Sequence, residues 1–521
     1  MSLEATTNAI EDHLIDAISF KLAPGASYVT DRRSVSFFPQ GSNIYKPETG
    51  TKVIKIALTG TGEWLDPSTL QLQFKLQNEQ DFGLYVIGQP HSFIRRARLL
   101  CGGTVVEDID QYNRVHEMLS ILSGRHNRDM DDASSVSQRW DSEEFYKIVS
   151  ENKLNSTILE QSPEFTYANI LPINSTDPTT IAEINTRFNN LKTERANNAK
   201  KLGKYWRLRG DHSKVVSTKL AFGLLNQPKW IPLRYAPLTL ELELVNNFSD
   251  VIIMPDGDRF TDATVSTQWS IQQVEVKCDV CTLDNALENS YEAHLLDKGT
   301  LPINYNTYIN QSQNISGQVD IAINVSRAIS RLKSIFFNFS KKSSANRVVL
   351  KRADAVALGN WDNGIIANFG DINKPWNGFY HPMSGQVPEE ELYDPRKELE
   401  YQIQIGSKQF PEYPIKSLAE SFCQLRKTMG ILNSTQGSFD ITGKQYEKLH
   451  HIVALDTEKT LQAGYTGLDM KRGQLMTIKI KATDTSATVG MPADQMPDNI
   501  HIVLHSDQIL DIGFTGTQVQ D

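Results

Sequence analysis

Two cysteines three positions apart, Cys278 and Cys281, form a CxxC pair, which is half of a common type of zinc site. The other half would have to come from a second cysteine or histidine pair, and no other pair in the sequence has finger-like spacing. The two cysteines also lie in an alternating, strand-like run, where side chains three residues apart point to opposite faces. We therefore expect two buried structural cysteines and no metal site.

Two histidine pairs are the other candidate metal ligands: His501 with His505, and His450 with His451. A jelly-roll metalloenzyme of the cupin type needs an HxH pair followed by a glutamate, all converging inside the barrel, and neither pair fits that pattern. We expect ordinary strand or surface histidines. The DGD triplet at Asp256–Asp258 resembles the start of a calcium loop but lacks the further carboxylates and the closing glutamate, which favours a turn.

Catalytic motifs are missing from the sequence. It contains no GxSxG, no HExxH, no phosphate-binding glycine loop and no dinucleotide fingerprint. We therefore expect a protein that is not an enzyme, with no catalytic residue, no cofactor and no metal. Aromatic side chains leave one alternative function open, a carbohydrate-binding or carbohydrate-active β-sandwich protein. The tryptophans that could stack on sugars, or else pack in a core or interface, are Trp64, Trp140, Trp206, Trp230 and Trp376.

The composition restricts the class of protein further. A chain of 521 residues with 39% apolar and 22% charged residues is long enough for two large folded domains. Its formal net charge is -9, and no lysine or arginine precedes Lys21, so we expect no direct sequence-specific binding of nucleic acid. No apolar run is long enough for a transmembrane segment, and the N-terminus lacks the pattern of a secretory signal. The expectation is a soluble chain made in the cytosol.

Cysteine usage agrees with that compartment. Four cysteines are too few for a disulfide framework in a chain of this size, so we expect reduced thiols.

Strand-like alternation occurs from end to end. In the stretch GEWLDPSTLQLQFKL, the apolar residues from Leu70 to Leu76 alternate with polar ones, which predicts a strand with one covered face. The preceding run VIKIAL predicts a second such strand, and Pro67 indicates a turn in the loop between them.

A hairpin followed by a short helix occurs twice. In the first half, RARLLCGGTVVEDI turns at Gly102 and Gly103 and is followed by the amphipathic run QYNRVHEMLSIL. In the second half, LEYQIQIGSKQFPEYPI turns at Gly406 and is followed by KSLAESFCQLRKTMG. Three further strands follow each helix, in the same order. This repeat predicts an all-β fold of two tandem antiparallel eight-stranded jelly-roll sandwiches with short packing helices.

The same pattern sets the expected boundaries. They are an N-terminal arm at 1–27, a first jelly roll at 28–284, a helical connector at 285–299 and a second jelly roll at 300–521. From about 123 to 210 the alternation disappears and the composition becomes polar, which predicts a long insertion in the first jelly roll.

Several segments together resemble one protein family. They are RSVSFFPQGSNIY, KVIKIALTGTGEWLDPSTLQLQF, LLCGGTVVEDI, LNQPKWIPLRYAPLTLELEL and VEVKCDVCTLDNALENSYEAHLL. Their succession is similar to that of double jelly-roll major capsid proteins, most closely those of polinton-like viruses and adintoviruses, and more distantly those of virophages and nucleocytoplasmic large DNA viruses.

The resemblance implies a function and partners. It implies a major capsid protein of a double-stranded DNA virus, forming trimeric, pseudo-hexagonal capsomers that tile an icosahedral shell. The insertion would be a tower on the outer surface, and the N-terminal segment an arm beneath the shell. The implied partners are the chain itself as a homotrimer, neighbouring capsomers, a penton or vertex protein and minor capsid proteins. The implied location is the virion, assembled in the host cytoplasm or nucleus.

Overall fold

A computed structural model gives the fold of the chain. It describes residues 28–48, 51–84, 86, 88–124, 134–136, 208–254, 266–297, 299–315, 320–340, 348–349, 379, 381, 398–432, 441, 446, 450–459, 466–471, 475–482 and 498–520.

Two facing antiparallel sheets form the first sandwich. One sheet has the order β1 (Val29–Phe37), β11 (Trp269–Leu283), β4 (Glu63–Asn78) and β7 (Ser213–Thr218). Two short strands extend this sheet: β2 (Ile44–Tyr45) pairs with β11 and β8 (Ile231–Pro232) pairs with β4. The other sheet has the order β3 (Val53–Leu58), β9 (Leu238–Leu244), β5 (Ile94–Cys101) and β6 (Thr104–Asp110).

The second sandwich repeats this arrangement. Its first sheet has the order β12 (Leu301–Asn314), β20 (Asn499–Gly513), β14 (Leu332–Ser340) and β18 (Ile452–Asp456), and the C-terminal β21 (Gly516–Gln520) pairs with β20. Its second sheet has the order β13 (Ile321–Val325), β19 (Met476–Ala482), β16 (Leu399–Ile405) and β17 (Lys408–Ile415). Outside the sandwiches, β10 (Ile253–Met254) pairs with β15 (Val348–Val349).

The strand orders identify both sandwiches as jelly rolls. When the eight strands that form the two four-strand paths of each half are numbered along the chain, leaving out β2, β8 and β21, the sheets contain strands 1-8-3-6 and 2-7-4-5 in both halves. This is the double-wound antiparallel arrangement of the jelly roll, with the first and last strands side by side. The predicted fold class is therefore confirmed.

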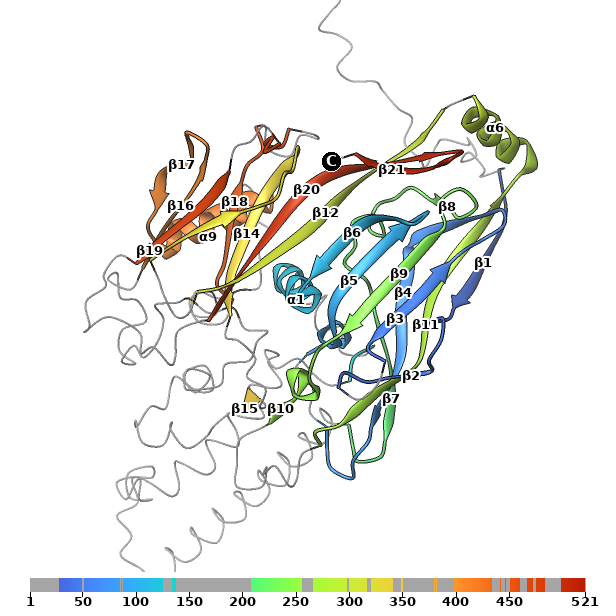
Figure 1. The fold of residues 1–521 in the computed structure, drawn as a ribbon, viewed down its shortest axis with the longest axis horizontal. Coiled ribbons are helices and arrows are strands. Elements are labelled where there is room, and N and C mark those ends of the chain that lie inside the picture. The colour runs from blue at the N-terminus through green and yellow to red at the C-terminus, as the bar shows by residue number, and fades with distance from the viewer. Residues whose placement is uncertain are drawn as a thin grey trace, which may run out of the picture.

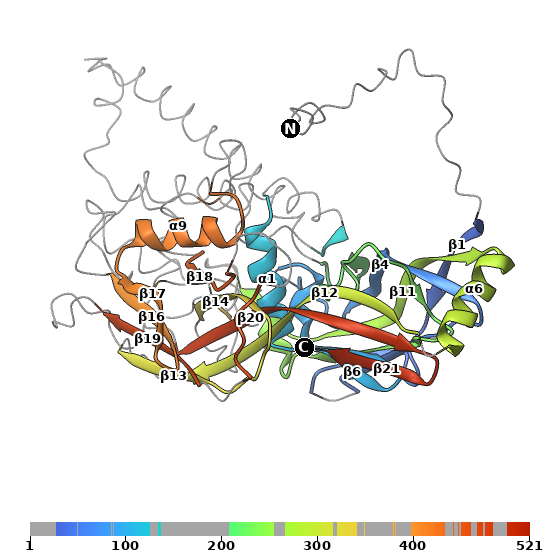
Figure 2. The same ribbon diagram turned by 90° about the horizontal axis from the view of Figure 1, so that it is seen from above.

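Short helices follow the same repeat. Helix α1 (Tyr112–Leu122) follows β6, and α9 (Leu418–Thr428) follows β17. Helix α6 (Asn285–Leu296) joins the halves and begins where Asp284 accepts a hydrogen bond from the amide of Ala286. The short 3-10 helices are η3 (Pro90–Phe93) and η5 (Phe248–Val251). As Figures 1 and 2 show, the sandwiches lie side by side, with α1 between them and α6 at the far end of the first.

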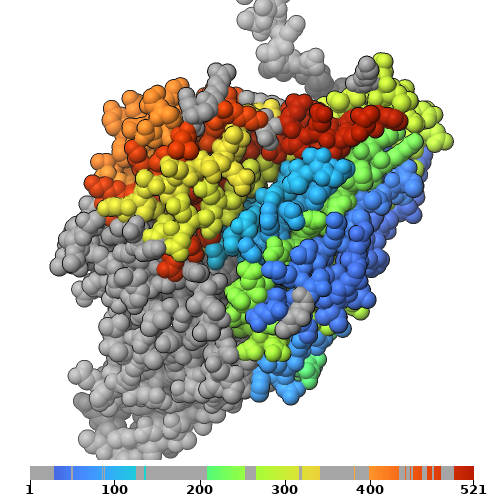
Figure 3. Space-filling model, viewed as in Figure 1, coloured from blue at the N-terminus to red at the C-terminus, as the bar shows by residue number. Residues whose placement is uncertain are grey.

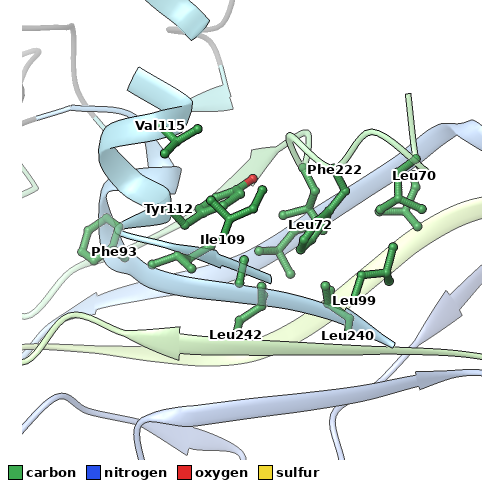
Figure 4. Close-up of a cluster of buried hydrophobic side chains, with 14 of the residues drawn as sticks. Leu70, Leu72, Phe93, Leu99, Ile109, Tyr112, Val115, Phe222, Leu240 and Leu242 are labelled. Carbon is green, nitrogen blue, oxygen red and sulfur yellow. The ribbon is translucent and has the colours of Figure 1, made fainter. Parts of the chain in front are cut away.

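Apolar residues at alternating positions fill the first core. Leu70 and Leu72 of β4 face Leu240 and Leu242 of β9, and all four are buried (Figure 4). Helix α1 closes one side of the same cluster with Tyr112, whose hydroxyl accepts a hydrogen bond from the amide of Ala221.

Strand β14 is buried on both of its faces. Ile335 and Phe337 point into the core of the second sandwich, whereas Phe336 belongs to the core shared with the first half. The nearly continuous apolar run SIFFNF is typical of a strand covered on both sides. The sheet that contains β14 is therefore an internal wall of the molecule.

Three details of the fold differ from the sequence predictions or were not predicted. The expected turn at Pro67 is wrong, because β4 continues through it with a register shift against β11, and the loop lies before Glu63. Strand β3 also pairs in the opposite sheet from β4. Strands β12 and β21 were not predicted, since the asparagines of LPINYNTYINQSQN hide the alternation of Ile303, Tyr305 and Thr307.

Candidate functional site: the seam between the sandwiches

The two jelly rolls meet along a surface that we call the seam. It is formed by β6 and α1 of the first half and by β12, β14 and β20 of the second. Asn310 of β12 donates from Nδ2 to the carbonyl of Asp110 at 3.0 Å. The hydroxyl of Tyr305 donates to Oε1 of Gln508 at 2.8 Å and lies 3.4 Å from the carbonyl of Val106. The seam therefore contains directional bonds as well as apolar contacts.

A buried carboxyl group lies in the seam. Glu107 of β6 accepts hydrogen bonds from the amides of Gly223 and Leu224, at 2.9 and 3.1 Å. Burial raises the pKa of Glu107 to about 7, and its bonds to these amides and to the Thr307 side chain oppose that rise. The backbone at Gly223 also lies very close to the carbonyl oxygen of Asn306 in β12, the residue next to Thr307. One carboxyl group thus joins a strand and a turn of the first half to the second.

A second polar contact joins α1 to the second sandwich. Nη1 of Arg114 lies 2.7 Å from Nε2 of His501, and Oγ of Ser340 lies 2.8 Å from the same nitrogen. Arg114 and His501 are separated by 387 residues in the sequence, and both are buried. Burial lowers the pKa of Arg114 to about 10, and burial together with the charge of Arg114 lowers the pKa of His501.

Helix α1 is fixed from its other side by η3. Nε2 of His91 lies 2.8 Å from Oε2 of Glu117, and the His91 ring stacks on His116 at 4.0 Å between centroids. Helix α1 thus carries polar contacts to both halves of the protein.

The C-terminal hairpin crosses the seam. Strand β20 is long enough to serve both cores, since Ile502 lies in the core of the second sandwich and Ile512 in the core of the first. From β21, Thr517 donates a hydrogen bond to the carbonyl of Cys101 at 2.8 Å. Figure 3 shows the red β20–β21 hairpin lying against the cyan strands of the first half.

Charged side chains form ion pairs on the outer face of the β3-β9-β5-β6 sheet. Glu241 of β9 pairs with Lys55 of β3 at 3.1 Å and with Arg98 of β5 at 2.8 Å. Further along, Arg96 of β5 pairs with Asp108 of β6 at 2.6 Å. The strands thus alternate in charge across the sheet, so these basic residues are neutralised within it.

The predicted cysteines are placed as follows. Cys278 and Cys281 are both buried free thiols on β11, and burial raises the pKa of each; that of Cys278 rises to about 12. Cys101 is also buried, whereas Cys423 is exposed. Among the described residues, no group of three histidine, cysteine or acidic side chains is arranged to hold a metal ion.

The prediction was strand or surface histidines; His501 and His505 lie on strand β20, and none of the four histidines is on the surface. His450, His451 and His501 are buried, and His505 is largely buried, with its Nδ1 3.0 Å from Oγ of Ser334. Other parts of the protein cover them: Arg114 of α1 contacts His501, Tyr308 of β12 stacks on His505, and Tyr446, which packs on Phe422 of α9, lies against His451. Sequence reasoning missed the roles of Arg114, Glu107 and His501 in the seam, because their partners lie far away along the chain.

Two of the five candidate tryptophans lie within the described segments. Trp64 is buried beneath Tyr291 of α6, with its indole N–H donating to Glu288 at 3.1 Å, and Trp230 is half-buried. Trp140, Trp206 and Trp376 lie outside the described residues, as do the DGD triplet, the N-terminal arm and most of the insertion.

The described polar groups of the seam bond one element of the chain to another inside the protein. Their chemistry is therefore structural: they fix the position of one sandwich against the other. Within the described segments, no helix is both long enough and apolar enough to cross a membrane.

Comparisons with known proteins find no match by sequence but several matches by structure. No family model matches the sequence, and no curated protein matches it. Solved structures do match along nearly the whole chain. The VP54 protein of PBCV-1, fitted into a reconstruction of the virophage Sputnik, has a TM-score of 0.53 at 11% identity, covering 96% of this chain and 99% of that one.

Two further structures agree with this match. A PBCV-1 virus capsid model has a TM-score of 0.53 at 10% identity, covering 96% of this chain and 99% of that chain. The Sputnik virophage structure has a TM-score of 0.52 at 12% identity, covering 98% of this chain and 92% of that one. At these identities the likeness concerns the fold, and it extends over both jelly rolls and their connection.

Proposed function

We propose that this chain is a major capsid protein of a double-stranded DNA virus, which forms trimeric, pseudo-hexagonal capsomers that tile an icosahedral shell. The observation that carries the proposal is the repetition of one jelly-roll strand order twice in a single chain, joined by a buried seam. The end-to-end likeness to a PBCV-1 virus capsid structure and to the Sputnik virophage structure supports it.

The two-sandwich geometry suits a subunit that repeats across a shell. A closed trimer of a chain with two similar sandwiches presents six sandwiches around its axis, which approximates six-fold packing while obeying three-fold symmetry. The contacts of Glu107 with Thr307 and of Arg114 with His501 would keep the two sandwiches of each copy in one orientation, so that the six sandwiches of a trimer are spaced regularly. Such a role needs rigidity and no catalysis, and we propose that the protein is not an enzyme.

The finer assignments belong to the same proposal. The chain divides into an arm at 1–27, a first jelly roll at 28–284 with an outward tower at about 123–210, a connector at 285–299 and a second jelly roll at 300–521. Its partners are two further copies, neighbouring capsomers, a penton or vertex protein and minor capsid proteins. The net charge of -9 favours packaging of the genome by other, cationic proteins. The likeness to polinton-like viruses and adintoviruses in particular stays a prediction.

The proposed location is the virion, after assembly in the host cytoplasm or nucleus. Light scattering of the purified protein tests the trimer, and the expected mass is about three times 58.6 kDa, or that of a larger particle. Negative-stain images should show blocks with a six-sided outline. A monomer at high protein concentration, with no ordered particles in the images, would contradict the proposal.

A further inference from the structure

The contact between Arg114 of α1 and His501 of β20 requires one protonation state of the histidine. Arginine carries N–H donors and no acceptor, so the 2.7 Å contact from Nη1 needs the lone pair of Nε2. Oγ of Ser340 lies 2.8 Å from that nitrogen, and its hydroxyl can either donate or accept. His501 is therefore neutral in the closed seam, with its proton on Nδ1.

Adding a proton to Nε2 would break this arrangement. The nitrogen would become a donor facing the N–H donors of Arg114, which has no acceptor, and a second cation would lie beside the guanidinium; the Ser340 hydroxyl could turn to accept from Nε2, but that does not relieve the contact with Arg114. His501 is 1% exposed and Arg114 is 8% exposed, so water cannot separate the two charges while the seam is closed. The proton can be accommodated only if α1 and β20 move apart.

We propose that the Arg114–His501 contact is an acid-sensitive latch, which holds α1 on the second sandwich at neutral pH and releases it as the solution becomes acidic. The latch lies within one chain, so it would operate whether or not the chains assemble into capsomers.

The size of the effect follows from the open state. With α1 released, His501 faces water and titrates near its ordinary pKa of about 6.5. The closed contact excludes the proton that the open state binds, so its stability is fully present above about pH 6.5 and is lost as the pH falls below that value. Each pH unit below this point raises the opening equilibrium constant about tenfold, which gives a factor of about 30 at pH 5.

Other charged groups face the same contact. Asp110 of β6 and Asp250 of η5 lie near enough to favour the charged form of Arg114. On the far side of α1, His91 of η3 contacts Glu117 and stacks on His116. These groups are the same in every chain compared, so the test uses chains that differ at the latch alone.

Glu107 acts in the opposite direction at the other part of the seam. Its pKa of about 7 means that it takes up a proton on acidification while the seam remains closed, which favours the closed state. A test of the latch must therefore read the opening of α1 locally rather than the stability of the whole seam.

Amide hydrogen exchange of α1 in the full chain, corrected for the intrinsic effect of pH, provides that local measurement. Between pH 7.5 and pH 5 we expect protection of α1 in the natural chain to fall about 30-fold. In His501→Gln the amide oxygen can still accept from Arg114 but cannot be protonated, and we expect a change of threefold or less. The matched control is His505→Gln on the same strand, whose histidine contacts Ser334 instead, and it should respond as the natural chain does.

A second variant keeps the test decisive if His501→Gln fails to fold. In Arg114→Gln the neutral amide can donate to a neutral histidine or accept from a protonated one, so the response to acid should fall clearly below that of the natural chain, while the burial of His501 maintains part of it. The proposal is overturned if α1 of the natural chain keeps its protection at pH 5. It is also overturned if a folded variant at either position responds as strongly as the natural chain.

Discussion

A Cβ atom added to Gly223 would lie 1.4 Å from the carbonyl oxygen of Asn306, across the seam between the two jelly rolls. No side chain can occupy that space without moving the turn away from β12. The amide of the same glycine donates to Glu107, so the contact holds both the backbone approach and the buried carboxyl group in place.

The substitution Gly223→Ala should therefore destabilise the protein strongly. We expect a loss of about 3 kcal/mol or more in the free energy of unfolding, because the turn must retreat and weaken the bonds to Glu107. Denaturant unfolding measures the loss. Gly62→Ala is the matched control, since nothing lies within 4 Å of the Cβ position there, and it should change stability by less than about 0.5 kcal/mol. Equal behaviour of the two variants would show that the close approach is absent.

A second prediction concerns the pH dependence that Glu107 causes. Its folded-state pKa of about 7 lies above the ordinary value near 4.3, so the unfolded chain releases this proton at lower pH than the folded chain. The contribution of Glu107 to stability is therefore fully present below about pH 4 and is lost as the pH rises through 7, by roughly 3 to 4 kcal/mol in all.

The substitution Glu107→Gln should remove this slope, because the amide does not titrate in that range. The measurement is the difference in unfolding free energy between the natural chain and the variant at several pH values from 4 to 8. Glu241→Gln, on the outer sheet face, serves as the control. A constant difference across the pH range would show that Glu107 is ionised throughout.

The turn of the second hairpin gives a third prediction. Gly406 has a φ of +58° between β16 and β17, a conformation that β-branched residues avoid. Gly406→Val should destabilise the protein by more than about 1 kcal/mol, measured by thermal unfolding. The neighbouring Ser407, which is exposed, offers Ser407→Val as a control of the same side chain in the same turn. If the unfolding temperature of Gly406→Val equals that of the natural chain, Gly406 does not hold the positive φ on which this prediction depends.

The elements predicted from the sequence are those whose signals are local. The alternation from Leu70 to Leu76 depends only on the two-residue period of a strand, and it is observed in β4. The turn at Gly406 depends on glycine's tolerance of positive φ, which the structure also shows. The repeat of hairpin and helix then sufficed to predict two sandwiches, because each must cover an apolar face.

The seam could not be predicted in the same way. In the run IHIVLH, the residues that alternate with Ile500 and Ile502 are expected to face water, and the sequence gives no sign that α1 covers them. Arg114 reaches His501 only because the fold brings together positions 387 residues apart. At Pro67 the local signal was misleading, because a register shift lets the strand pass through a residue that ordinarily indicates a turn.

The last prediction concerns Thr517, which connects the C-terminal strand to the first sandwich. Its hydroxyl donates to the carbonyl of Cys101 at 2.8 Å in a buried position, so Thr517→Val removes the donor while keeping the shape of the side chain. The carbonyl would then lack this partner inside the protein, and we expect a loss of about 1 to 2 kcal/mol in unfolding free energy. Thr515→Val, in the exposed turn of the same hairpin, should have little effect. Hydrogen exchange adds a second measurement, because loosening of β21 should expose the amides of β21 and of its partner residues in β20 while those of β16 stay protected. If Thr517→Val and Thr515→Val unfold alike, the hairpin is held by its apolar contacts, and the bond to Cys101 contributes nothing to joining the halves.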